Sequence, residues 1–121
     1  AVCCFNLIQA TQKRYDEKIK LHPHADEEIG SFSEDVLEFM QFNIENLLNA
    51  SLSDGDLEKA VEFESDNDKT RNALRETSVQ RISKSGEVEP EILFMDIIKN
   101  FERIGDYSLN ISQALARVVV K

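Results

Sequence analysis

Glycine and proline are scarce in this chain, which has 4 Gly and 2 Pro among 121 residues. β-Sandwiches and barrels join many short strands through turns that use these two residues, so the composition favours long helices instead. The length fits one domain that is large enough to bury a core. The sequence therefore predicts a single all-α domain over residues 1–121.

Positive charge is also in short supply. The 23 acidic residues outnumber the 14 Lys and Arg, and the formal net charge is −9. Such a surface repels nucleic-acid phosphates, and no basic stripe with interleaved aromatic residues offsets this repulsion. We therefore expect no nucleic-acid partner, and we expect cations or basic proteins as partners instead.

Cysteine and long apolar runs are nearly missing as well. Cys3 and Cys4 are adjacent and no CxxC motif is present, which favours a reduced, cytoplasmic setting. The opening segment AVCCFNLI is too short to span a bilayer or to act as a signal peptide. Because the sequence begins without Met, we expect an excerpt from a longer protein.

The first predicted helix is the shortest and covers residues 3–21. Its apolar residues lie at roughly helical spacing: Phe5, Ile8, Tyr15 and Ile19. Pro23 and Gly30 then interrupt the pattern, and we expect a loop there. His22 and His24 in this loop are available as metal ligands, but a solvated loop explains them equally without a metal.

Residues 31–121 are predicted to form a three-helix unit that follows the N-terminal helix and loop of residues 1–30. The first helix of this unit begins near Ser31 or Ser33, because Ser31 and Glu34 have the spacing of a capping box. Its expected apolar stripe contains Val36, Leu37, Met40, Ile44, Leu47 and Leu48.

Two more long helices complete the unit. One begins at a cap at Ser53 or Asp54 and ends before Gly86. The last carries Pro90 in its first turn, where the missing N–H costs nothing, and continues to Val119. Short loops join these helices, so we predict an antiparallel helical bundle of three long helices plus a shorter N-terminal helix.

The third helix carries two acids within its expected apolar stripe. That stripe contains Leu57, Val61, Val79 and Ile82. Glu64 and Asp68 fall on the same stripe, and burying carboxylates is costly unless they are paired or coordinate a cation. Arg71 and Arg75 are available as ion-pair partners, and the residues alone do not decide between ion pairs and a cation site.

The last helix repeats this spacing in the segment NFERIGDYSLNI, residues 100–111. Its main apolar stripe contains Ile97, Phe101, Ile104, Ser108, Ile111 and Leu115. Glu102 and Asp106 lie one turn apart on an adjacent face, and Gly105 lies between the two faces. Glycine inside a helix costs about 1 kcal/mol relative to Ala, so we expect a neighbouring helix to approach closely here. Two E-x-x-x-D pairs on consecutive helices offer oxygen ligands that suit Mg, Ca, Mn or Fe.

The segment NFERIGDYSLNI resembles the signature of PhoU domains, in which E-R-I-G-D followed by N-I lies on the last helix of a three-helix unit. AVEFESDNDKTRNALRE is similar to the preceding helix of that family, and the resemblance covers about residues 33–117. The stretch RETSVQRISKSGEVEPEILFMDIIKNFERIGD most resembles the C-terminal cytoplasmic PhoU-like domain of bacterial Na+/phosphate cotransporter-related proteins. Asn100 stands where many relatives have an acid.

This resemblance implies an accessory or regulatory cytoplasmic domain, not an enzyme, that acts in phosphate uptake or its control. It implies a membrane transporter segment upstream in the full-length chain. It also implies binding of divalent or trivalent metal ions, such as Fe, Mn or Mg, through the E-x-x-x-D pairs. Carried over to this chain, the metal ligands are Glu64, Asp68, Glu102 and Asp106.

Two other functions stay open. A carboxylate-bridged di-metal enzyme also gathers Glu on facing helices, but it requires Glu-x-x-His motifs, and both His residues lie in the Pro-containing loop. A purely structural interaction bundle with ion-paired acids is the other. We also expect a homo-oligomer, a symmetric dimer, because apolar residues such as Phe94 and Met95 lack an obvious internal partner.

Overall fold

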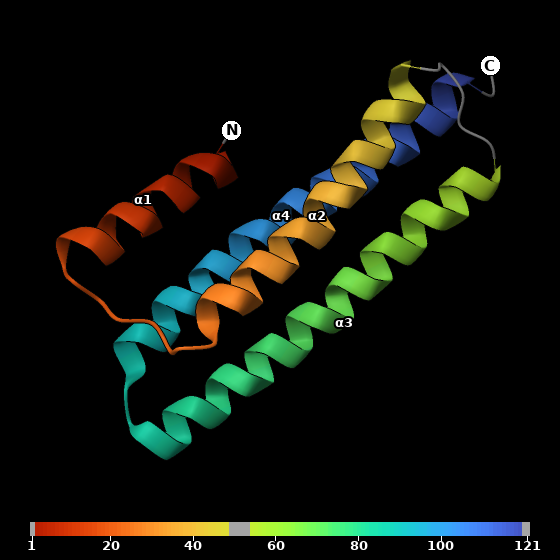
Figure 1. Cartoon of the computed structure of the whole chain (residues 1–121). Coiled ribbons are helices and arrows are strands. Elements are labelled where there is room, and N and C mark those ends of the chain that lie inside the picture. The colour runs from red at the N-terminus through yellow and green to blue at the C-terminus, as the bar shows by residue number, and fades with distance from the viewer. Residues whose placement is uncertain (1, 49–53, 120–121) are drawn as a thin grey trace.

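The computed structural model describes residues 2–48 and 54–119, and within these residues it contains four helices and no strand (Figure 1). The helices are α1 (Val2–Asp16), α2 (Ala25–Leu48), α3 (Asp54–Ser85) and α4 (Val88–Val119). α3 runs antiparallel to α2 and α4, and the shorter α1 lies beside the first half of α4 (Figure 1). The predicted all-α class and helical bundle are confirmed.

The connection between α1 and α2 differs from the prediction. α1 ends at Asp16, before Lys18, whose φ of 53° is left-handed. α2 begins at Ala25, so the expected start at Ser31 or Ser33 is wrong and Gly30 lies inside the helix. Three consecutive acids after Ala25 stabilise the positive end of the helix dipole, which explains the earlier start.

The connection between α3 and α4 agrees with the prediction. Gly86 has a φ of 72°, and its N–H donates to the carbonyl of Ile82 at 2.8 Å. This left-handed glycine ends α3. Pro90 lies in the first turn of α4, where the helix needs no N–H from it.

Two apolar clusters hold the helices together. The first joins α2, α3 and α4 and consists of Ala25, Phe32, Val36, Leu74, Phe94 and Ile98. The second fastens α1 to α4 and consists of Ala10, Leu93 and Ile97. Phe94 is buried in the first cluster and Met95 packs against it, so the expectation that these two residues lack internal partners is wrong. Self-association therefore remains a prediction, but Phe94 and Met95 no longer support it.

Many residues of the apolar stripes expected for α1, α2 and α3 are exposed, although Val36 of α2 is buried as expected. On α1, Phe5, Ile8 and Tyr15 are exposed, whereas Cys3 and Ala10 are buried. On α2, the exposed residues include Leu37, Met40, Ile44 and Leu48. On α3, Val61 and Val79 are exposed, and the inward positions are Ala60, Asn67, Leu74 and Ser78. The described part of α4 keeps its expected stripe except at Ile111, which is half exposed.

Buried polar groups link the helices at both ends of the three-helix unit. At one end, the Asn43 amide donates to the carbonyl of Ser108 at 2.7 Å and accepts from the hydroxyl of Ser112. At the other end, Arg81 of α3 pairs with Glu28 of α2 and with Glu91 of α4. These contacts fix the register of the helices, because a shift of one helix along another would leave buried polar groups unpaired.

No helix in the described ranges combines the length and the apolar character that crossing a membrane requires.

Candidate metal centre

The α3–α4 contact brings three of the four predicted metal ligands together. Glu64 and Asp68 lie one turn apart on α3, and Asp106 lies on α4. One carboxylate oxygen from each of the three lies within 4.8 Å of the others. Glu64 and Asp68 are half-buried and Asp106 is exposed, so the group is open to solvent on the Asp106 side.

Glu64 is the most perturbed member of this group. Burial raises the pKa of Glu64 to about 8, helped by hydrogen bonding with Asp106 and by the charges of Asp106, Asp68 and Glu102. Its Oε2 atom is buried and has no hydrogen-bond partner among the described residues. A buried carboxylate oxygen without a partner, in a group of acids, is a position that a cation would satisfy.

Gly105 explains how the two helices come this close. A Cβ atom at Gly105 would lie 3.6 Å from Glu64 Oε2 and 3.8 Å from Asn67 Nδ2. The side chains of α3 therefore rest directly on the backbone of α4 at this point. This agrees with the expectation that a helical glycine marks a close approach.

Glu102, the fourth predicted ligand, has a different partner. It pairs with Arg71 of α3, and the side chains of both residues are less than one-fifth exposed. The Oε2 atom of Glu102 is buried without a hydrogen-bond partner in the described part of the chain. The negative charge of Glu102 also helps to raise the pKa of Glu64. Glu102 is thus close to the three-carboxylate group without belonging to it.

The ion-pair alternative holds for one acid of the four. Arg71 pairs with Glu102, and within the described residues neither Glu64 nor Asp68 has an ion pair. Arg75, the other expected partner, is exposed on α3. Among the described ion pairs, arginine therefore supplies no compensating charge to the three-carboxylate group.

Sequence reasoning missed the contribution of Asn67. This residue is 6% exposed, and its Nδ2 atom lacks a hydrogen-bond partner among the described residues while it faces Gly105. One signal could have found it, since Asn67 lies one turn after Glu64 and seven residues from both Ala60 and Leu74. That spacing places it on the inward line of α3.

Asn100 and the two histidines lie outside the group. The Oδ1 atom of Asn100 accepts from the amide of Asn6 at 3.3 Å, so this position, where many relatives have an acid, instead fastens α1. His22 and His24 lie in the loop before α2, where the His24 N–H donates to His22 Nδ1.

The residues fit a hard cation. Three carboxylates supply oxygen donors, which Mg, Mn and Fe ions accept, and one of these oxygens is buried and unpartnered. A cation bound by Glu64, Asp68 and Asp106 would replace the repulsion between these acids with attraction.

Comparison with known proteins agrees with the resemblance seen in the sequence. A family model described as the PhoU domain matches residues 33–115, which include all four predicted ligands. No curated protein and no solved structure matches the chain significantly.

Proposed function

Because the chain belongs to the PhoU domain family, we propose that it regulates phosphate transport and binds a metal cation between α3 and α4. The family match points to a regulatory role in phosphate homeostasis, and the family is regulatory or accessory rather than typically enzymatic. The proposal adds that this domain acts on a membrane transporter of the Na+/phosphate cotransporter kind.

The observation that carries the cation proposal is the convergence of Glu64, Asp68 and Asp106 on one point. In a chain with 23 acids, two acids one turn apart are common. Three acids from two helices, with a buried unpartnered oxygen and no balancing arginine among the described residues, are an arrangement that costs stability without a cation.

A bound cation would act as a link between the two helices that contain the family's sequence motif. Binding to the folded state stabilises it by mass action, so the packing of α3 on α4 would depend on the metal concentration. The residues of the chain do the binding, and the cation supplies charge neutralisation. The alternative of a carboxylate-bridged enzyme lacks support, because neither histidine lies in the carboxylate group.

The proposal is tested by titrating Mn²⁺, Mg²⁺ or Fe²⁺ into the metal-free protein. At a free concentration about 100 times the Kd, a cation that binds only the folded state raises the free energy of unfolding by about 2.7 kcal/mol. The Asp106→Asn variant is expected to lose this gain, because it removes the one ligand that α4 contributes. The melting temperature with and without each metal is the measurement.

The matched control is Glu62→Gln, which neutralises an exposed acid on the same helix two residues from Glu64. This variant is expected to keep the full metal response. If no cation raises the melting temperature of the wild type, or if Asp106→Asn responds like Glu62→Gln, the site does not bind metal. Phosphate uptake by cells that carry either variant then tests the regulatory role separately.

A further inference from the structure

We propose that an apolar groove between the second halves of α2 and α4 docks an amphipathic helix of a partner protein, with Lys or Arg along its flanks. In this α2–α4 groove, Leu37 and Met40 of α2 and Phe101 and Ile104 of α4 line a cavity. The exposed Ile44 and Ile111 extend these two walls by helical spacing. The proposal is independent of the metal site, which lies at the α3–α4 contact.

The groove stays open because α1 packs only along the first half of α4. α1 has 15 residues whereas α4 has 32. Ala10 packs on Leu93 and Ile97 in the first half of α4, and Asn6 reaches Asn100. Beyond Asn100, α2 and α4 continue past the N-terminal end of α1 (Figure 1).

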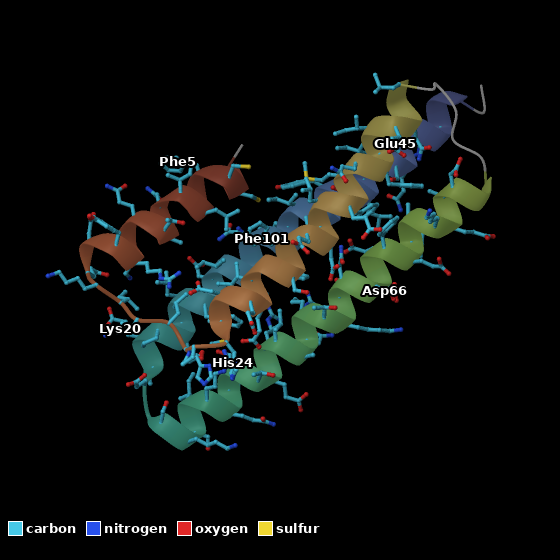
Figure 2. All side chains as sticks on the ribbon, viewed as in Figure 1. Phe5, Lys20, His24, Glu45, Asp66 and Phe101 are labelled. Carbon is cyan, nitrogen blue, oxygen red and sulfur yellow. The ribbon has the colours of Figure 1, made fainter. Side chains whose placement is uncertain are left out.

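α2 and α4 leave a hollow between them. A cavity of about 340 Å³ opens there between α2 and α4 and is lined by Ser33, Glu34, Val36, Leu37, Met40, Phe101 and Ile104. Phe101 lies on α4 beside α1 and α2, and it packs against both apolar clusters (Figure 2). Phe101 therefore connects the cavity to the cluster that holds α1 on α4.

Apolar residues continue both walls of the groove toward the C-terminal ends of α2 and α4. Ile44 lies seven residues after Leu37, and Ile111 lies seven residues after Ile104, so each residue continues its own wall by two helical turns. Leu37 and Ile44 are each 52% exposed, and Ile111 is 50% exposed. An apolar groove whose wall residues recur at helical spacing is a surface that can bind the apolar face of another helix.

The acidic residues of α2 indicate which kind of partner helix would bind in the groove. α2 contains seven acids and no Lys or Arg. Glu34 lines the cavity, and Glu38 and Glu45 are exposed on the same helix; Figure 2 shows Glu45 near the far end of α2. A docking helix with basic flanks gains from these acids, whereas one with acidic flanks is repelled.

The same charges disfavour a second copy of this chain as the occupant. A symmetric pairing of two grooves with antiparallel helices places α2 against α2, and with it two sets of Glu34, Glu38 and Glu45. Like charges placed side by side at an interface oppose association. The groove therefore fits a partner protein of opposite charge better than it fits itself.

The test uses the 121-residue chain and three fluorescent peptides of about 18 residues. The first carries Leu at helical a and d positions with Lys at the flanking positions, the second replaces these Lys by Glu, and the third scrambles the first. Binding is followed by fluorescence anisotropy at about 0.15 M salt. The first peptide is expected to bind at least ten-fold more tightly than the other two.

Substitutions in the chain locate the binding site. Ile44→Ser and Ile111→Ser are expected to weaken binding of the first peptide at least ten-fold, because each removes an apolar wall residue. Val79→Ser is the matched control, since Val79 is 59% exposed on α3, and it is expected to leave the affinity within two-fold. All three positions are exposed, so the variants are expected to fold.

Three results would overturn the proposal. One is equal affinity for the Lys and Glu peptides, which removes the role of the acids on α2. Another is an equal effect of Val79→Ser and Ile44→Ser, which places the peptide elsewhere. The third is a dimer of the chain in sedimentation that Ile44→Ser dissociates, because the occupant is then a second copy.

Discussion

At the scale of single residues, Glu64 makes the stability of the fold depend on pH. Its pKa rises from an ordinary value of 4.5 to about 8, first because of burial and then because of Asp106, Asp68 and Glu102. Between these two pH values the folded protein holds a proton on Glu64 that the unfolded chain releases. The free energy of unfolding therefore falls as pH rises from about 4.5 to about 8, and this contribution is constant above pH 8.

This pH dependence predicts the behaviour of Glu64→Gln in the presence of a chelator. The variant is expected to match the wild type near pH 5 and to exceed its free energy of unfolding at pH 8. The difference is about 1–2 kcal/mol, allowing for solvent screening at this half-buried site. Urea denaturation at several pH values measures it. The exposed control Glu62→Gln is expected to follow the wild type, and a Glu64→Gln curve parallel to the wild type would contradict the assignment.

How far the residues of the site could be predicted depends on the kind of contact. The i, i+4 spacing places Glu64 and Asp68 on one face of a helix, and this part follows from the sequence. Which acid takes Arg71 does not follow, because Asp68 lies three residues away on the same helix whereas Glu102 lies on another helix. In the structure Arg71 pairs with Glu102 across the α3–α4 contact.

At the scale of helices, the capping, glycine and proline positions predicted the number of helices better than the hydrophobic pattern predicted their inward faces. On α3 the inward positions Ala60, Asn67 and Leu74 recur every seven residues but are small, polar and apolar in turn. Hydrophobicity alone prefers the neighbouring line of Val61 and Val79, which is exposed. The true line is set by hydrogen bonds and close helix approach, neither of which a hydrophobic pattern records.

The prediction at this scale compares Gly30 with Gly86, because the two glycines differ in backbone conformation. Gly30 lies inside α2, and a Cβ atom added there would meet no neighbouring side chain or helix within 4 Å. Gly30→Ala is therefore expected to stabilise the fold by up to about 1 kcal/mol. Gly86 has a φ of 72°, so Gly86→Ala is expected to destabilise it by about 1–2 kcal/mol.

Urea denaturation of both variants measures the two free energies of unfolding. Each variant serves as the control for the other, because the two substitutions add the same methyl group. If Gly86→Ala does not destabilise the fold, the left-handed turn at Gly86 does not end α3, and if Gly30→Ala destabilises it, the interior of α2 does not tolerate the added methyl group.

At the scale of the whole molecule, α1 is attached to the other helices less extensively than they are to one another. Among the helices, α1 packs closely only against α4. The exposed pair between Arg14 and Asp26, at 2.8 Å, adds a link to the start of α2, and such surface pairs contribute about 0–1 kcal/mol. By contrast, α2, α3 and α4 share the larger apolar cluster and the buried networks of Arg81 and Asn43. We therefore expect α1 to open at a lower free energy than the three-helix unit.

The two cysteines allow this opening to be measured, because Cys4 is exposed on α1 while Cys3 is buried. A thiol reagent is expected to react with Cys4 at once and with Cys3 in a slower phase that reports the detachment of α1. Asn6→Ala removes the hydrogen bond to Asn100, worth about 1 kcal/mol, and is expected to speed the slow phase about five-fold. Its urea midpoint is expected to change little. If Cys3 instead reacts only at the rate of global unfolding, α1 and the three-helix unit unfold together, and the attachment of α1 to α4 is as strong as the rest of the bundle.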